Sequence, residues 1–466
     1  MKKLILGLTG LMLVSNLGQA QSVKTEIKHS SSVSVGSLVK QNLSVNSNTA
    51  LANLSVGNSV PISALSPLAP ITNVTAEAPL SVSVMQGVQD EKQGADDPMR
   101  SKTFSRSFTL DGSDKINLSN KYGTILIKTW DKKEIKVDVD IKAYSKDAGD
   151  AQKLLDETTI EAGKSADLVS FRTIIGTRDG RYGSSTRNGK LIWRREVRVN
   201  YVVYMPASND LSVSNTYGGL TMGNLSGALY AKVQYGGFVA GTLNNSNNYI
   251  SVQYGSAEIE ELNKAVIKQQ YGSGLTVGTI GTLDLDAQYT TVNIKTIKGN
   301  ATVKQQYGKG LNIGAVNNLE LDAQYVNVNL GTIHGNATVK QQYNSISIGS
   351  VNKLNIRAQY ANVKLNNLKG DGNFDLDYNK LSIENIGAGC KNLTVNADYA
   401  SVSLGFDTGY HADFDVQTRY GGFSPGSASS KQIGDGDTSK HYAGKIGNGG
   451  GGTINIKADY GSVSFR

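Results

Sequence analysis

Tyrosine recurs at a nearly constant interval through the second half of this chain. The intervals from residue 217 onward are 18, 19, 17, 18, 18, 18, 18, 17 and 18 residues. The series comprises Tyr217, Tyr235, Tyr254, Tyr271, Tyr289, Tyr307, Tyr325, Tyr343, Tyr360 and Tyr378, and Tyr399, Tyr420 and Tyr460 continue it with insertions. A fixed period this short is typical of a solenoid whose coils pack only on their neighbours.

Each repeat contains two segments of alternating polarity. Residues 283–289 read LDLDAQY, and residues 292–294 with Ile297 form the second segment, which ends at Gly299-Asn300. Period-2 alternation bounded by Gly or Asn predicts short strands joined by tight turns. Gly or Asn also follows many of the tyrosines directly, which predicts a turn that needs a positive φ. These residues are Gly236, Gly255, Gly272, Gly308, Asn344 and Asn379.

Charge distinguishes a coil of 18 residues from one of 36. Three positions before successive tyrosines stand Lys268, Asp286, Lys304, Asp322 and Lys340. Coils of 18 residues would stack each Asp between two Lys at about 4.8 Å. Coils of 36 residues would stack like charges on one another, which is unfavourable. The sequence therefore predicts the shorter coil, although the Arg that follows in this series, at position 357, breaks the alternation.

Glutamine and alanine suggest how the coils stack. Gln precedes the tyrosine in eight successive repeats, at 234, 253, 270, 288, 306, 324, 342 and 359. Stacked amides of this kind can form a hydrogen-bonded ladder. One position earlier, Ala287, Ala323 and Ala358 alternate with Gln269, Gln305 and Gln341, which predicts small-over-large packing. The tyrosines share the parity of Leu and Ile, so we expect their stacked rings to help build the core.

The rest of the chain divides by composition. Residues 1–20 combine Lys2 and Lys3, a short apolar run and a small-x-small site at Gly18-Gln19-Ala20, as in a secretory signal peptide. Residues 21–100 are rich in Ser, Val, Asn and Ala and hold five of the seven prolines, which predicts a disordered low-complexity linker or stalk, with a poorly patterned small domain as the alternative. Residues 101–210 predict an N-terminal β-rich cap with one short helix near 145–158, and residues 211–466 predict the solenoid.

Three stretches resemble a known bacterial family. They are NKYGTILIKTWDKKEIKVDVDIKA at 120–143, YVVYMP at 201–206 and GGGGTINIKADYGSVSF at 449–465, together with repeated YGG. The chain resembles envelope proteins described as a "putative adhesin" family with β-strand repeats and unknown function, and is similar to the head domain of "putative auto-transporter adhesins". The resemblance covers about residues 100–466. It implies a right-handed parallel β-helix and supplies no catalytic residue.

The sequence contains no recognisable pattern of catalytic or metal-binding residues. The only cysteine, Cys390, lies in an insertion and excludes a disulfide scaffold. His334 occupies a turn position, while His411 and His441 lie in irregular loops without a partner pattern. Asp371-x-Asn373-x-Asp375 lacks the remaining ligands of a calcium loop, so surface turns explain it better. We predict no catalytic residue, no metal site and no cofactor.

The predicted function is that of an exported, non-enzymatic cell-envelope protein, either an adhesin or a structural and binding scaffold. Its candidate binding face is a repetitive polar stripe formed by Lys268, Asp286, Gln288, Lys304, Gln306, Asp322, Gln324, Lys340 and Gln342. The residues themselves favour the interpretation that the stripe only stabilises stacking and keeps the rod soluble, with binding as the alternative. A net charge of +8 suits anionic glycans or other envelope components, whereas nucleic acid is excluded because the charges interleave.

Two other functions stay open: a β-helical enzyme that acts on polysaccharide, and an outer-membrane β-barrel. The enzyme would need acids clustered on one face, and the barrel would need lipid-facing apolar bands. We expect a location in the periplasm, on the cell surface or outside the cell, peripheral to the membrane rather than spanning it. The sequence predicts no oligomeric state.

Overall fold

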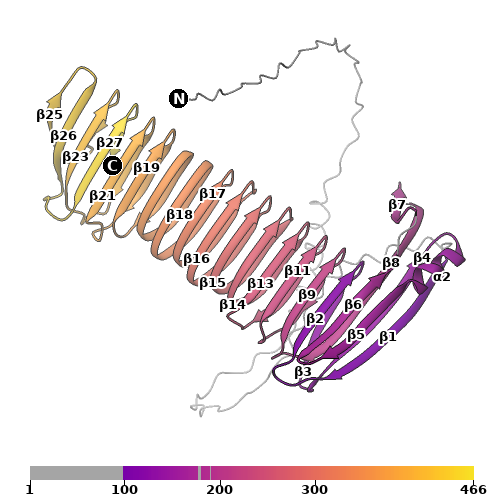
Figure 1. Cartoon of the computed structure of the whole chain (residues 1–466). Helices are drawn as coiled ribbons and strands as arrows, with labels where there is room; N and C mark the ends of the chain where they lie inside the picture. Colours follow the sequence, from indigo (N-terminus) through magenta and orange to yellow (C-terminus); the bar gives the residue numbers. More distant parts are fainter. Residues whose placement is uncertain (1–97, 177–179, 189) are drawn as a thin grey trace, which may run out of the picture. The chain divides into compact units, whose positions relative to one another are not determined.

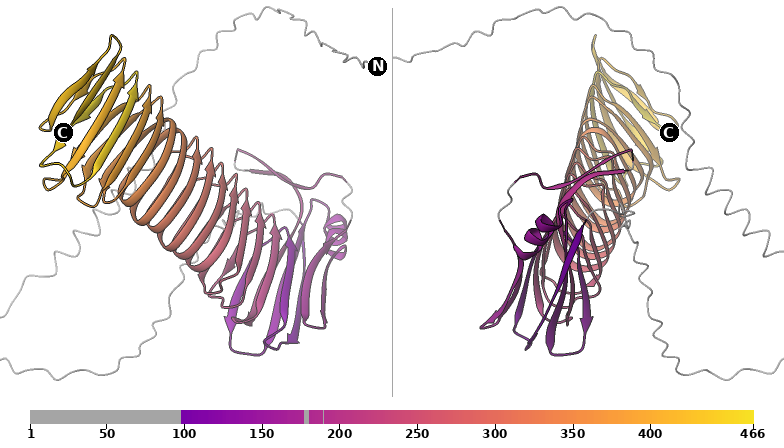
Figure 2. Two further views of the ribbon diagram at one scale, coloured as in Figure 1. Left: turned by 60° about the vertical axis from the view of Figure 1, so that its left-hand side comes forward. Right: turned by 90° about the vertical axis from the view of Figure 1, so that its right-hand side faces the viewer.

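We describe a computed structural model of the chain, which covers residues 98–176, 180–188 and 190–466. These residues form a β-solenoid in which the chain winds through stacked coils of about 18 residues, with successive strands paired in parallel (Figure 1). Figure 2 shows the coils following one another along a single axis. The predicted all-β solenoid is confirmed. The predicted signal peptide and almost all of the predicted stalk lie outside the described residues.

The first coil forms well before the predicted series begins. Strands β2 (Lys115–Lys121) and β3 (Ile125–Trp130) meet at Tyr122. They pair in parallel with β9 (Asp210–Thr216) and β10 (Leu220–Met222), which belong to the second coil. The chain therefore completes one coil, leaves to build a cap, and returns to add the next coil on top of the first.

The cap closes both sheets of the solenoid at this end. Its elements are β1 (Met99–Thr109), β4 (Glu134–Tyr144), α2 (Ala148–Asp156), β5 (Thr158–Ser165), β6 (Leu168–Ile175), β7 (Gly183–Arg187) and β8 (Lys190–Pro206). One sheet continues from β3 through β8 to the antiparallel strands β4 and β1, and the other continues from β2 through β6 to β5. The predicted short helix is confirmed as α2. It buries Ala151, Leu154 and Leu155, and its N-cap Asp147 accepts a hydrogen bond from the backbone of Asp150.

The middle coils contain short strands at either end and long, bent strands between them. In chain order they are β11 (Leu229–Gln234), β12 (Phe238–Leu243), β13 (Asn248–Gln253), β14 (Ser256–Gln270), β15 (Gly274–Gln288), β16 (Val292–Gln306), β17 (Leu311–Gln324), β18 (Val328–Leu368), β19 (Gly372–Asp377), β20 (Lys380–Ile386), β21 (Asn392–Asp398) and β22 (Ser401–Phe406). Strand β16 passes unbroken through the break predicted at Gly299-Asn300. The expectation of two turns per coil is therefore wrong for β14 to β17, in which only the tyrosine corner interrupts the strand, and β18 runs through even that corner. Breaks after Leu243 and after Ile386 give the coils on either side of these strands the second turn that was expected.

Aliphatic side chains fill the interior in layers. In β16, for example, Val292, Ile294, Ile297 and Val303 all point inward and are at most 3% exposed. This regular inward alternation is what the period-2 pattern predicts for strands with one buried face.

Small and large side chains alternate inside the tyrosine corner, as predicted. Ala287 stacks between Gln269 and Gln305, and all three are fully buried. Gln305 Nε2 donates to the backbone oxygens of Thr290 (3.1 Å) and Gly310 (3.2 Å). The buried glutamine therefore supports the turn from inside by donating to two backbone oxygens, of which that of Gly310 also accepts from the backbone amide of Val292.

The tyrosines lie on the surface, not in the core, so that prediction is wrong. From Tyr217 onward the members of the series are 38–54% exposed. Each of them, together with Tyr122, has φ between 49° and 62°. The left-handed conformation turns the chain at this corner and aims the ring away from the interior. Inward and outward positions alternate only as long as the residues keep the strand conformation. The tyrosine leaves that conformation, so the alternation of the preceding Leu and Ile residues predicted the wrong side for its ring.

The residue after the tyrosine has a different role from the one predicted. Among the six residues named for a positive φ, only Asn344 has one, at 68°. Where glycine follows the tyrosine, it allows a close approach: a Cβ on Gly236 would lie 2.1 Å from the backbone oxygen of Gly218, and one on Gly255 would lie 1.8 Å from that of Gly236. Other corners carry a larger residue at this position, such as Val326. These glycines therefore allow successive corners to stack backbone on backbone.

The far end of the solenoid has an order that departs from the sequence. Its strands are β23 (Ala412–Arg419), β24 (Phe423–Ser424), β25 (Ser429–Asp435), β26 (Ser439–Ile446), β27 (Thr453–Asp459) and β28 (Val463–Phe465). Strand β27 lies between β21 and β23 and pairs in parallel with both (Figure 1). The last coil along the chain thus lies between two coils that come earlier in the sequence. The antiparallel strands β26 and β25 then cover the outer edge of β23.

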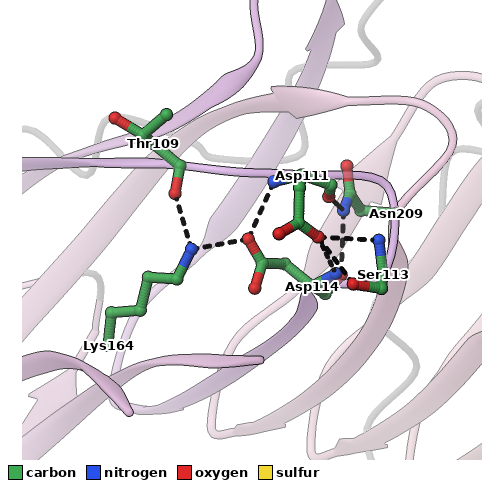
Figure 3. Close-up of polar contacts among 6 residues, drawn as sticks. All are labelled: Thr109, Asp111, Ser113, Asp114, Lys164 and Asn209. Carbon is green, nitrogen blue, oxygen red and sulfur yellow. Dashed lines mark hydrogen bonds and ion pairs between the residues drawn. The ribbon is translucent and has the colours of Figure 1, made fainter. Parts of the chain in front are cut away.

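A polar network ties the first coil to the point where the chain returns (Figure 3). The buried carboxylate of Asp114 pairs with Lys164 Nζ at 2.6 Å, and Lys164 also donates to the backbone oxygen of Thr109 at 3.0 Å. Asn209 Nδ2 donates to the backbone oxygens of Asp111 (2.7 Å) and Asp114 (2.8 Å). Every group here is used in holding the β1–β2 loop against β5 and the start of β9, so we assign the network a structural role.

The same loop gives a prediction about pH. The hydroxyl and the backbone amide of Ser113 donate to Asp111 Oδ1 at 2.7 and 2.9 Å, which holds the pKa of Asp111 below its ordinary value. A folded-state pKa below the unfolded one stabilises the fold above about pH 4, and that contribution is lost as the pH falls through the folded-state value. Asp111→Asn keeps an acceptor oxygen without the charge. We expect its thermal midpoint to lie below that of the wild type at neutral pH and to meet it near about pH 2. A gap of equal size at every pH would contradict this.

Candidate functional site

The nine predicted site residues lie together on one outer face. Lys268, Asp286, Lys304, Asp322 and Lys340 are directly paired neighbours across β14 to β18. Gln288, Gln306, Gln324 and Gln342 form a second column beside them. The tyrosines form a third column at the edge of this face. We call these three columns the polar face. The register confirms the 18-residue coil, while binding by the polar face stays a prediction.

The charges of the polar face alternate without close contact. Among the described residues, no lysine–aspartate pair of the column from Lys268 to Lys340 approaches within 4.0 Å. The column continues with Arg357 against Asp375, whose Nε–Oδ2 distance is 3.5 Å. Solvent-exposed pairs of this kind contribute little each. The charged groups therefore stay available to a partner instead of being consumed in tight ion pairs.

Reversing one charge in the column tests whether the alternation matters. Lys304→Asp places three carboxylates in a row at positions 286, 304 and 322. We expect a loss of about 1 kcal/mol at low salt, which shrinks at high salt because screening weakens the repulsion. The same change in the turn, Lys309→Asp, is the matched control and should cost less. Equal midpoints for the two variants in thermal melts would contradict the expectation.

The predicted glutamine ladder exists in part. Gln234 Nε2 donates to Gln253 Oε1 at 3.2 Å, and Gln253 donates to Gln270 at 2.9 Å. In later coils Gln288 instead donates to Asp286 of its own strand at 3.3 Å, and Gln324 does the same toward the Asp of its own coil. A carboxylate is a stronger acceptor than an amide, so the ladder ends where acidic residues enter the neighbouring column.

The tyrosine rings stack continuously along the solenoid. Neighbouring centroids are 4.4–5.4 Å apart, and the planes are within 15° of parallel. The stack begins at Tyr122 and ends in the order Tyr399, Tyr460, Tyr420. Because each inner ring is covered on both faces by its neighbours, a ligand beside the column meets only ring edges and hydroxyl groups. This geometry does not offer the open aromatic face on which sugars stack.

The opposite face carries a feature that the sequence reasoning missed. A shallow hollow of about 630 Å³ runs across β15 to β18. Asn293, Asn312 and Asn329 form one wall, with Asn312 Nδ2 donating to Asn293 Oδ1 at 2.8 Å and Asn329 Nδ2 donating to Asn312 Oδ1 at 3.0 Å. We call this hollow the asparagine groove. The sequence does contain a sign of the asparagine column, since these asparagines are spaced by 19 and 17 residues, close to the tyrosine period.

Two of the three histidines are placed differently from the prediction, while His411 lies in the loop before β23 as predicted. His441 lies on β26, not in an irregular loop, and its Nε2 is 2.6 Å from Asp415 Oδ2. His411 accepts a hydrogen bond from the backbone of Asn448 at 3.0 Å. His334 is exposed on the bent strand β18 and not in a separate turn. None of these histidines lines either face described above.

The remaining candidate groups have structural partners. Cys390 is fully buried, and burial raises the pKa of its thiol to about 11, which disfavours the reactive thiolate. Asp371 accepts from the backbone amides of Lys391 and Asn392, each at 3.0 Å. Asn373 donates to its neighbour in the previous coil, and the next acidic residue along β19 pairs with an arginine. The three oxygen-bearing side chains of the 371–375 motif are therefore used separately.

Among the described residues there is neither a metal-binding cluster nor a helix that could span a membrane. Within residues 98–466, apart from the gaps, no three side chains of His, Cys, Asp or Glu gather closely enough to hold a metal ion. The helical part of the same residues contains no segment with the length and apolar character needed to cross a membrane.

Known proteins resemble this chain only in structure, and only weakly. No family model matches the chain, and no curated protein matches it. Similar solved structures include a "putative cell adhesion protein" from Clostridium sporogenes ATCC 15579, with 12% identity, a TM-score of 0.16 and coverage of 78% of this chain and 99% of that one.

Two further structures match over similar lengths. A "putative lipid binding protein" from Parabacteroides distasonis ATCC 8503 has 9% identity and a TM-score of 0.19, and covers 78% of this chain and 97% of its own. A "putative adhesin" from Parabacteroides merdae ATCC 43184 has 10% identity and a TM-score of 0.18, and covers 78% and 96%. Proteins named for adhesion are thus among the structures this chain resembles, but at such TM-scores the likeness decides nothing about its function.

Proposed function

We propose that this chain is an exported, non-enzymatic protein of the cell envelope that acts as an adhesin or binding scaffold through its polar face. One observation carries the proposal: charge, amide and ring edge recur at each of five successive coils in a fixed register. A partner with a repeating structure would meet the same amide and ring edge at every coil and the same charge at every second coil. Repeated weak contacts sum to useful avidity without a deep pocket.

The partner class follows from the chemistry of the polar face. Exposed lysines attract acidic groups, and the half-buried aspartates and amides offer hydrogen bonds to hydroxyl groups. Glycans and other envelope or surface components carry both kinds of group. Export to the periplasm, the cell surface or the medium is part of the proposal and rests on the character of residues 1–20.

Binding of the full-length chain to an array of bacterial and host surface glycans tests the proposal. The test variant replaces Lys268, Lys304 and Lys340 by Gln, and the matched control makes the same change at Lys309, Lys369 and Lys391, which are exposed and lie outside the polar face. We expect the test variant to lose about tenfold or more in affinity, because three lost contacts of roughly 0.5 kcal/mol each multiply. The control should bind like the wild type.

Two outcomes would overturn this proposal. An equal loss in the control variant would mean that net charge alone, and not the polar face, drives binding. Shortened products after incubation with a bound polysaccharide would mean that the protein is an enzyme. Treatment of intact cells with protease tests location separately, since a protein exposed on the surface is cleaved and a periplasmic one is protected.

A further inference from the structure

We propose that the hairpin formed by β7 and the first part of β8 is a membrane-docking arm, which binds the phosphate-rich surface of an anionic lipid bilayer. We call this hairpin, residues 181–188 and 190–195, the basic arm. The basic arm belongs to the cap and lies outside the polar face. The inference therefore does not depend on what the polar face binds.

The arm and the residues just after it hold most of the net charge of the chain. Residues 181–198 contain six basic residues and one acidic residue, so this short segment carries +5 of the total of +8. In the polar face, by contrast, lysine and aspartate alternate from coil to coil. Charge of one sign that gathers on one element attracts a partner of the opposite sign.

The cations nearest the cap are neutralised within the protein. Arg194 and Arg198 both pair with Glu196, at 2.8 and 3.3 Å. Arg195 pairs with Asp150 of α2, also at 2.8 Å. These ion pairs fix the arm to the cap, so its free charge lies toward the tip.

The tip of the arm places two like charges side by side. Asn188 has a φ of 52° and is followed by glycine, a pair of residues that favours a tight hairpin turn. Arg187 and Lys190 on either side of this turn lie directly opposite one another. Among the described residues neither of them forms an ion pair, and like charges in this arrangement repel. A phosphate group that contacts both cations would relieve the repulsion.

An apolar residue lies exposed close to these cations. The register of β7 on β8 shifts between Ser185 and Thr186, which leaves Ile192 unpaired in a β-bulge, and this isoleucine is 46% exposed. A soluble polyanion offers no contact to an isoleucine. The surface of a bilayer offers phosphate groups to the cations and acyl chains to the apolar residue, so it fits the arm better.

The two strands of the arm pair only with each other. Among the described residues β7 pairs with β8 alone, while β8 joins the cap sheet from Glu196 onward (Figure 1). The guanidinium of Arg181 lies 3.9 Å from the centre of the Trp193 ring, which holds a third cation on the arm. A ribbon of two strands is marginally stable in water, so contact with a partner would stabilise it.

Protection of the strand edges is the competing explanation for these cations. Charged side chains on an exposed hairpin prevent it from pairing with other chains. That role requires no exposed isoleucine, and it predicts no binding to membranes.

Sedimentation with lipid vesicles tests the inference in the full-length chain. One set of vesicles contains phosphatidylglycerol mixed into phosphatidylcholine, and the other contains phosphatidylcholine alone. The arm variant combines Arg187→Gln with Lys190→Gln, and Ile192→Ser is made separately. The matched control combines Lys309→Gln with Lys369→Gln, which removes two exposed cations of the solenoid.

We expect the wild type to bind the anionic vesicles and not the neutral ones, and to bind less tightly as salt rises. The arm variant should lose about twentyfold in affinity, because each basic residue near an anionic surface contributes about fivefold. Ile192→Ser should lose about fivefold, because less apolar surface enters the bilayer. The control and the triple lysine variant of the polar face should bind like the wild type.

Several results would overturn the inference. They are absence of binding by the folded wild type, equal binding to both kinds of vesicle, an equal loss in the lysine control, and unchanged binding by Ile192→Ser. Displacement from the vesicles by inorganic phosphate at constant ionic strength would mean that the arm binds single phosphate groups and not a bilayer. Loss of binding in the triple lysine variant would assign the membrane contact to the polar face. Because the vesicles carry no glycan, failure of the proposed function would leave all these expectations unchanged.

Discussion

We expect Gly236→Ala to lower the free energy of unfolding by roughly 2–4 kcal/mol, the range of severe overpacking. The added Cβ would lie 2.1 Å from the backbone oxygen and 2.4 Å from the backbone carbon of Gly218 in the preceding coil. Both obstructing atoms belong to a backbone that is held by pairing on either side. The corner can relieve the clash only by separating two coils.

The neighbouring glycine provides the control for this substitution. A Cβ on Gly237 would come no closer than 3.5 Å to Ser256 Oγ, an ordinary contact, and its φ is not positive. Gly237→Ala should therefore stay within about 0.5 kcal/mol of the wild type. Urea unfolding followed by circular dichroism measures both variants. Similar midpoints for the two alanine variants would show that the corner is far softer than its close contacts imply.

Removing one ring from the tyrosine column should have the second largest effect. Tyr307 stacks on Tyr289 and on Tyr325, with both centroid distances at 5.1 Å. Each aromatic contact contributes about 0.5–1.5 kcal/mol beyond area burial. We therefore expect Tyr307→Ala to lower the free energy of unfolding by about 1–3 kcal/mol in denaturant unfolding.

Three substitutions at this position separate stacking from backbone strain. Tyr307 has a φ of 55°, a conformation that costs an alanine about 1–2 kcal/mol and a glycine almost nothing. Tyr307→Phe keeps the ring and should resemble the wild type, while Tyr307→Gly should fall between the Phe and Ala variants. If Ala proves as stable as Phe, the stacked rings contribute nothing and the column has no stabilising role.

The tyrosine corner also shows why local pattern has limited reach. The period of 18 predicted the coil correctly because it depends only on how often the chain returns to one place. Which way Tyr307 points depends on its φ, and alternation carries no information about a residue that leaves the strand conformation. The tyrosine at 122 escaped the predicted series because the whole cap is inserted between the first coil and the second.

The candidate sites differ in how far they could be predicted. The charged and glutamine columns of the polar face were predicted, because charge alternation between Lys304 and its neighbours needs only the correct period, whereas its tyrosine column was predicted to lie in the core. The asparagine groove was not, although Asn293, Asn312 and Asn329 are nearly periodic. A hollow exists only where side chains are missing beside such a column, and that depends on how close the backbones of adjacent coils approach.

By itself the sequence determined the coil length, the inward alternation of aliphatic residues, the stacking of alanine on buried glutamine and the short helix of the cap. All of these follow from periodicity and from contacts between neighbouring coils, which are local in a repeat protein. The tertiary structure alone decided that the tyrosines face solvent, that a hollow lies along the other sheet, and that β27 sits between β21 and β23. Strand order is a choice among equivalent parallel edges, since a repeated pattern pairs equally well with several neighbours. Only the packing of the whole end of the solenoid selects one of them.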